Sequence, residues 1–297
     1  GTGVVKVVAG ALTVSPQGHA WNSSWSGLSV GMGCLVSSEK NCLVGRLEVL
    51  ENGRVSLGMS SLGIGIGCAD GMVLQRGGAF SHASAITRED TRYMPVVVGY
   101  AGGVGAYVLS NGTLTVTASD TVHNKIFVGG CLSDDLNRQC AFACKVSPGS
   151  GMSRGLLAVR GGTMTAAQSD VVVGKDGVGI FELGGTGVAT VSKLDVLPTG
   201  MLLFAPNDGM VSPLLTVKDL AFSDNAILKI DMTGLTKHNA WTKLAAVSGT
   251  FDVANAAVEL TLPADWKAKD CEVVFERNGE KGIWFRRPKA GMVLLFR

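Results

Sequence analysis

Two loops are the most charged of this sequence, and binding or catalytic chemistry would first be sought there. One loop runs from Ser81 to Tyr93 and the other from Ser133 to Gln139. Glycoside hydrolysis needs two carboxylates about 5 to 10 Å apart. Carboxylates also bind cations, and both carboxylate and guanidinium groups form hydrogen bonds with sugars. The candidate ligand-binding residues are the charged and aromatic ones of these loops: Glu89, Asp90, Arg92, Tyr93, Asp134, Asp135 and Arg138.

The two loops belong to different parts of a repeated unit. The first precedes a "VVVG" segment and the second follows the counterpart of that segment. We therefore expect them at different corners of the fold, where they need not meet. The competing interpretation is that these are ordinary solvated loop charges.

The remaining reactive side chains form no known catalytic or metal-binding motif. The four histidines are far apart, no pair has metal-ligand spacing, and we expect each on the surface or in a loop: His19, His82, His123 and His238. There is no G-x-S-x-G nucleophile motif and no C-x-x-C pair. Most of the seven cysteines are expected to be buried thiols, and a bridge among Cys131, Cys140 and Cys144 stays open. The sequence thus predicts no catalytic residue, no metal and no cofactor.

Glycine-rich segments such as "GGVGAYVLSNG" resemble nucleotide-binding loops only superficially. A phosphate-binding loop leads into a helix, whereas the residues after these glycines have the alternation of a strand. A calcium-binding roll needs aspartate after G-G-x-G, and this chain has Ala106 and Tyr107 after one such segment and Ile180 and Phe181 after another.

Composition narrows the class of protein. Charged residues make up 17% of the 297 residues, hydrophobic residues make up 46%, and 41 residues are glycine. Disordered chains have the opposite balance. A net charge of +2 gives no strong attraction to nucleic acid, and no apolar run approaches the roughly 20 residues that span a bilayer. The chain opens on Gly1 without the regions of a signal peptide, so we expect it to be the mature part of a longer precursor.

Internal repetition is the strongest signal. The segment "VVVGYAGGVGAYVLSNGTLTV" from Val96 aligns with "VVVGKDGVGIFELGGTGVATV" from Val171, and "LGIGIGCADGMVLQRGGAF" from Leu62 gives a third copy. Fragments recur as "LSVG", "CLVG" and "IFVG", and Gly67, Gly99 and Gly129 mark spacings of 32 and 30 residues. Each unit is predicted to be a β-strand, a glycine corner, a strand, a Gly or Asn-Gly turn and a strand.

These periods are typical of solenoids, and no glycine-free window keeps a helical pattern. We therefore predict an all-β protein: a right-handed parallel β-helix over residues 1–235, followed by a small antiparallel β cap over residues 236–297. The segment "LKIDMTGL", Leu228 to Leu235, is expected to be the last turn of the helix. Asn278-Gly279 predicts a hairpin within the cap.

The unit, written hhVGxxGxGxhxhxxGGxhxV with h for apolar, resembles the repeats of bacterial autotransporter passenger domains and autotransporter-associated repeat proteins. The resemblance covers roughly Leu28 to Val217. It implies a secreted or surface-displayed bacterial β-helix, often adhesin-like, and it supplies no catalytic residues.

All five tryptophans lie outside the repeats: Trp21, Trp25, Trp241, Trp266 and Trp284. Because the ends of a solenoid need atypical capping segments, we expect these rings to plug the two ends. The alternative is that they form platforms on which sugars stack.

Three classes of function follow. We favour a non-enzymatic, extracellular or cell-surface structural or adhesin-like protein whose partners are glycans or other host or cell-surface components. The first alternative is a polysaccharide lyase or hydrolase, which a carboxylate pair on adjacent turns with one raised pKa would favour. The second is a surface assembly module, which an exposed apolar flank such as "VVVG" or "GMLLFAP" would favour. The sequence leaves the oligomeric state open.

Overall fold

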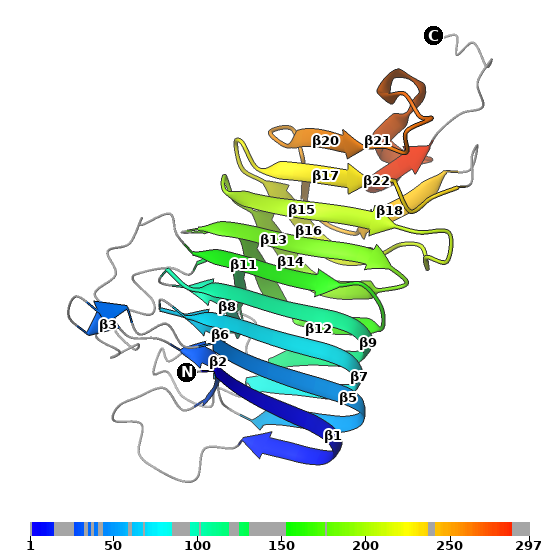
Figure 1. The fold of residues 1–297 in the computed structure, drawn as a ribbon. Coiled ribbons are helices and arrows are strands. Elements are labelled where there is room, and N and C mark those ends of the chain that lie inside the picture. The colour runs from blue at the N-terminus through cyan, green and yellow to red at the C-terminus, as the bar shows by residue number, and fades with distance from the viewer. Residues whose placement is uncertain are drawn as a thin grey trace.

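The protein is an all-β structure built on one large curled sheet (Figure 1). The computed structural model describes residues 2–14, 27–32, 35–36, 39–40, 44–58, 61–67, 69–84, 96–100, 102–118, 125–130, 153–175, 177–236 and 241–286. Over these ranges there is no α-helix, and the one helical element is the 3-10 turn η1 (Ala268–Asp270). Accordingly, none of the described residues form a helix able to cross a membrane.

The strands are short to medium in length and follow one another throughout the chain. In order they are β1 (Thr2–Val14), β2 (Gly27–Met32), β3 (Leu35–Val36), β4 (Glu39–Lys40), β5 (Val44–Gly58), β6 (Ser61–Ile66), β7 (Asp70–Ser84), β8 (Val96–Tyr100), β9 (Val104–Ala118), β10 (Lys125–Val128), β11 (Arg154–Val159), β12 (Thr163–Val173), β13 (Val178–Gly185), β14 (Val188–Val196), β15 (Gly200–Pro206), β16 (Leu215–Phe222), β17 (Ile227–Asp231), β18 (Thr242–Val247), β19 (Phe251–Asp252), β20 (Ala257–Thr261), β21 (Glu272–Arg277) and β22 (Glu280–Arg286).

Successive copies of the unit lie side by side in parallel. The long strands β1, β5, β7 and β9 pair in that order, and β9 then pairs with β11 along its first part and with β12 along its second. The short strands β2, β6, β8 and β10 form a second run that ends on the last residues of β12. Figure 1 shows the stack rising from β1 to β17 and β20.

The two runs of strands cross closely at one corner, and glycine makes the crossing possible. Gly99, at the end of a short strand, has a φ of +73°, and a Cβ there would overlap the carbonyl oxygen of Arg154. Gly105, near the start of a long strand, would place a Cβ on the carbonyl oxygen of Ile64. Two columns of glycines continue this arrangement, and at every member except Gly3 a Cβ would overlap backbone atoms: the short-strand column is Gly31, Gly65, Gly99, Gly129 and Gly174, and the long-strand column is Gly3, Gly45, Gly71, Gly105, Gly155, Gly179 and Gly200.

The columns confirm one sequence alignment and correct another. Val96 pairs with Ile126, which in turn sits beside Val171 through β10 and β12, as the repeat predicted. Gly99, however, is matched by Gly65 and not by Gly67, because Ile64 pairs with Val98. The "CLVG" segment ends in Gly45, which belongs to the long-strand column, so it was wrongly grouped with "LSVG" and "IFVG".

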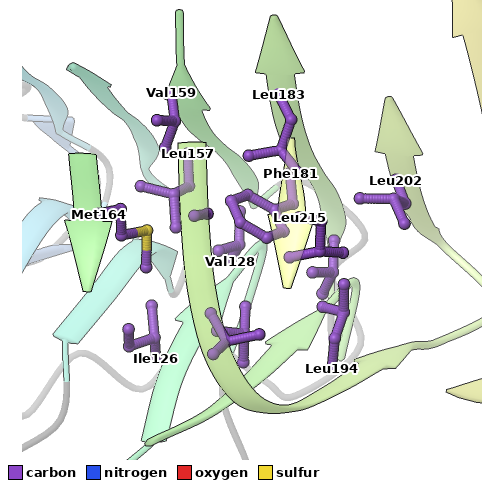
Figure 2. Close-up of a cluster of buried hydrophobic side chains, with 14 of the residues drawn as sticks. Ile126, Val128, Leu157, Val159, Met164, Phe181, Leu183, Leu194, Leu202 and Leu215 are labelled. Carbon is purple, nitrogen blue, oxygen red and sulfur yellow. The ribbon is translucent and has the colours of Figure 1, made fainter. Parts of the chain in front are cut away.

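The core is the interior of the curled sheet. Along β13 and β15 every second residue is buried, as a strand with one inward face requires. Figure 2 shows inward side chains from several strands meeting there, among them Leu157, Phe181 and Leu202, each at most 2% exposed. In the "VVVG" flank, Val96 and Val98 belong to this core, and Val97 is buried in a second, smaller cluster with Ile66, Phe127 and Val172. The flank therefore gives no support to an assembly module.

One polar network lies within this core. The hydroxyl group of Tyr107 donates to Gln75 Oε1 at 2.6 Å, and Gln75 Nε2 donates to the carbonyl oxygen of Thr113 at 2.9 Å. Tyr107 is 1% exposed, and its ring meets that of Phe80 edge-on with centroids 5.6 Å apart. Burial raises the pKa of Tyr107 well above 10.0, so the phenol stays a donor. The network ties β7 to the turn of β9.

Tyr107→Phe is expected to lower the free energy of unfolding by about 1 to 3 kcal/mol, because Gln75 Oε1 loses its donor in a buried site. Urea denaturation of Tyr107→Phe, Gln75→Leu and the double variant measures the coupling between the two side chains. If the losses of the two single variants add up to the loss of the double variant, the two side chains are not coupled and the network contributes nothing as a unit.

Parallel pairing continues past the expected end of the helix. β18 and β19 pair in parallel with β16, and β20 pairs in parallel with β17, so stacked strands reach Thr261 and extend beyond Leu235. Antiparallel pairing joins β22 to both β18 and β21. The Asn278-Gly279 hairpin is confirmed, with φ values of +54° and +77° that fit a type I′ turn.

Candidate functional site

The sequence-predicted ligand-binding residues lie outside the described residues. This holds for Glu89, Asp90, Arg92 and Tyr93 of the first loop, and for Asp134, Asp135 and Arg138 of the second. The same is true of the cysteine trio and of three of the histidines. His82 is described, and the expectation of a surface position was wrong: it lies on β7, 1% exposed. Side chains alternate along β7, and the buried side chain of His82 faces inward where that of Ser81 faces outward.

A different group of polar side chains comes together on the antiparallel cap formed by β18, β22 and β21. The inward face of this cap is apolar, with Ile283 and Phe285 buried. Trp284 and Arg286 alternate with them and so lie on the outward face. Lys243 is the cross-strand partner of Trp284, and Glu272 is that of Arg286.

Two indole rings and three cations form a cluster on this outward face, which we call the cap cluster: Trp241, Lys243, Arg277, Trp284 and Arg286. Lys243 Nζ lies 4.7 Å from the centre of the Trp284 ring, and Arg286 Cζ lies 4.6 Å from that of Trp241. Arg277 Cζ lies 5.2 Å from the ring of Trp241 and 5.4 Å from that of Trp284. These are cation–π distances, each worth about 0.5 to 1 kcal/mol at a partly exposed site.

Two of the three cations are paired with carboxylates. Arg286 donates to Glu272 Oε2 from Nε at 3.2 Å and from Nη2 at 2.7 Å, and Lys243 Nζ lies 2.7 Å from Glu280 Oε2. The Lys243 hydrogen bond and charge, helped by Arg277, hold the pKa of Glu280 below its ordinary value. No carboxylate of the described residues pairs with the Arg277 guanidinium. The planar guanidinium group of Arg277 thus lies over two indole rings, and its N–H groups can donate hydrogen bonds to a bound acceptor.

Sequence reasoning missed Arg277, although a signal for it was present. The Asn-Gly turn at Asn278 and Gly279 fixes the hairpin register and pairs Arg277 with Glu280. Side chains alternate between the two faces of a strand, so Trp284 lies on the same face as Glu280 and therefore on the same face as Arg277, the cross-strand partner of Glu280. The tryptophans were expected as end plugs, and Trp266 fits this, being 7% exposed and stacked on Phe285 at 6.2 Å. Trp241 and Trp284 are instead half-buried on the outward face, while Trp21 and Trp25 lie outside the described residues.

A second set of charges follows a row across neighbouring strands. In the strand register, Lys125 lies opposite Asp170, Asp170 opposite Lys193, and Lys193 opposite Asp219. The sign of the charge therefore alternates from strand to strand. Asp195 forms an ion pair with Lys193, with 2.8 Å between Asp195 Oδ2 and Lys193 Nζ. Burial raises the pKa of Asp170 above its ordinary value, and the charges of Lys193 and Lys125 counteract this. Alternating signs stabilise a sheet, which is the simplest role for this row.

Asp170→Asn is expected to raise the melting temperature slightly at pH 7. The raised pKa means that the folded state holds the Asp170 proton more tightly than the unfolded state, so the wild type loses stability as pH rises through that pKa. The difference between variant and wild type should vanish below about pH 3, where both side chains are neutral.

Asp219→Asn is the matched control on the same row. The backbone N–H of Thr250 donates to Asp219 at 2.6 Å and lowers the pKa of this carboxyl, so the variant should lose stability at pH 7. Melting curves between pH 3 and 8 compare the two. If both variants raised the melting temperature at pH 7, or both lowered it, the opposite directions of the two pKa shifts would be contradicted.

Two hollows differ in kind. A cavity of about 10 Å³ beside His82 and Tyr107 has room for about one water molecule. An open groove of about 550 Å³ lies beside the bends of β1, β5 and β7, and its lining includes Gly10, Glu51, Asn52, Arg54 and Gly78. Its other lining residues are glycine and alanine, so its polar side chains are those of Glu51, Asn52 and Arg54.

Comparisons of the chain with family models, with curated proteins and with solved structures find no match.

Proposed function

We propose that the protein is a non-enzymatic, adhesin-like protein of the bacterial surface or exterior, built as a right-handed parallel β-helix whose cap cluster binds acidic glycans. The autotransporter-type repeat supports the location, and the parallel register of many stacked copies supports the helix. Right-handed connections between parallel strands occur in roughly 98% of known cases, which supports the handedness.

The observation that carries the glycan proposal is the position of Arg277. A guanidinium group fixed over two indole rings loses little conformational freedom when it binds, and its fork of N–H donors matches a carboxylate or sulfate. The half-buried indoles of Trp241 and Trp284 provide the apolar surface that sugar rings contact. Neutral sugars would gain only the contact with the indoles and not the charge-assisted hydrogen bonds to Arg277. The cap cluster is therefore suited to uronic acids or sulfated sugars.

Arg277→Gln is expected to weaken binding to acidic glycans by at least about tenfold, since a charge-assisted hydrogen bond contributes about 1.5 to 3 kcal/mol. A glycan array followed by titration calorimetry with the best acidic glycan measures this. Lys175→Gln is the control, because it removes an exposed positive charge from the end of β12. Unchanged affinity in Arg277→Gln, or wild-type protein that binds no acidic glycan, would reject the proposal.

A deletion of residues 85–95 belongs in the same experiment. Binding lost with this deletion and kept in Arg277→Gln would move the binding site from the cap cluster to the charged loop. Equal melting temperatures of the variants and the wild type exclude misfolding as the cause.

A polysaccharide-active enzyme is the second candidate, and one observation favours it. Asp170 and Asp195 are carboxylates on neighbouring strands, and the pKa of Asp170 is raised. If they act as acid and base, the wild type cleaves an acidic polysaccharide and Asp170→Asn does not. Size-exclusion chromatography of the polysaccharide after incubation separates this candidate from binding alone.

A further inference from the structure

The first strand of the stack, β1, carries a glycine, Gly3, that no close contact among the described residues requires. Gly3 pairs with Gly45 and so heads the long-strand column. In that column, a Cβ at Gly71 would overlap backbone atoms of Val30 and Gly65, and one at Gly105 would overlap those of Ile64 and Gly99. A Cβ at Gly3 would meet no atom of the described residues within 4 Å.

The neighbours of Gly3 are equally uncovered. Val4, Val5 and Val8 are 52%, 54% and 57% exposed, although valine is among the residues most often buried. In the described part of the chain, β2 pairs through one side only, with β6. Among the described residues, the end of the stack therefore presents an unpaired strand edge, exposed apolar side chains and a space over a glycine that no described atom fills.

The other copies indicate what fits this space. In each, a short strand that ends in a glycine crosses the glycine of the long strand. In two copies the connection has the same short length: Gly65 precedes Gly71 by six residues, and Gly99 precedes Gly105 by six. A strand of this type would lie parallel to β2 and bring its own backbone against Gly3.

We infer that the open end at β1 is a docking surface for one further short strand of the Val-Gly type, joined to the N-terminal side of β1. The glycine column and the exposed Val5 carry this inference, because Val5 shares the face of Gly3 and its register partner Leu47 is buried. The strand would cover Val5, pair with the edge of β2 that no described strand occupies, and use the space that Gly3 leaves.

The test adds the segment "VVVGYAG", residues 96–102, directly before Gly1. This places the added glycine six residues before Gly3 and aligns Gly1, Thr2 and Gly3 with Gly103, Val104 and Gly105. Hydrogen exchange of the β1 amides is compared in four proteins, with and without the added segment and with and without Gly3→Val.

We expect the added segment to slow exchange of the β1 amides by at least about tenfold, because a covered strand opens less often. Gly3→Val should abolish this gain and change nothing in the chain without the segment. Absence of the gain, or an equal effect of Gly3→Val in both backgrounds, would overturn the inference. A gain that disappears on dilution would also overturn it, since the segment would then dock on another molecule.

Discussion

Replacing Gly71 by alanine is expected to abolish cooperative folding of the chain, or to lower its free energy of unfolding by more than about 4 kcal/mol. The added Cβ would overlap the carbonyl oxygen of Val30 and the backbone nitrogen of Gly65. Both are backbone atoms of strands held on either side, so no flexible side chain can move away. The measurement is guanidinium denaturation followed by far-ultraviolet circular dichroism.

Gly58→Ala is the matched control for this prediction. A Cβ at Gly58 meets no atom of the described residues within 4 Å, and the φ of Gly58 is not positive. Alanine restricts the unfolded chain more than glycine does, so this variant should be unchanged or more stable by about 0.4 to 1 kcal/mol. Equal midpoints for Gly71→Ala and Gly58→Ala would show that the strands do not cross as closely as described.

The second large effect is expected for Phe181→Ala, which should cost about 3 to 5 kcal/mol. Phe181 is 0% exposed and lies among inward side chains of several strands, including Leu157 and Leu202 (Figure 2). The backbone of stacked strands cannot collapse into the space that the ring leaves. The loss therefore includes both the apolar transfer energy and the cavity.

Ile180→Ala controls for the loss of apolar surface in the same strand. Ile180 alternates with Phe181 and is half-buried on the outward face. Its truncation should cost less than about a third as much, because solvent can fill the space. If the two variants lose the same stability in urea denaturation, β13 does not have the inward and outward faces described.

The repeated fold was predictable from local signals. Alternating apolar residues and recurring glycines place Val96 beside Ile126, as β8 and β10 do. Choosing between Gly65 and Gly67 was beyond the sequence, because "LGIGIG" alternates glycine and isoleucine over both positions. Only the pairing of Ile64 with Val98 decides it.

The candidate site was harder to predict because it depends on residues far apart in the chain. Trp241 and Arg277 come together only after β18 and β22 pair, and the turn at Asn278 was the single local signal. His82 shows the same limit: a histidine in a strand of mixed polarity looks exposed until the other side of the curled sheet covers it. Charge density alone drew attention to the loops, and it gave no information on the cap.

The central claim is that glycine-punctuated copies stack in parallel and in a fixed register. Thr165 of β12 and Thr190 of β14 are direct partners in that register, while Val188 is the partner of Thr163. The most direct test is oxidative cross-linking of the pair Thr165→Cys and Thr190→Cys, with Thr165→Cys and Val188→Cys as the offset control, located by mass spectrometry of peptides. We expect a rapid bridge only for the in-register pair, because disulfides need Cα atoms within about 7 Å. Equal bridging of both pairs, or of neither, would contradict the stacking.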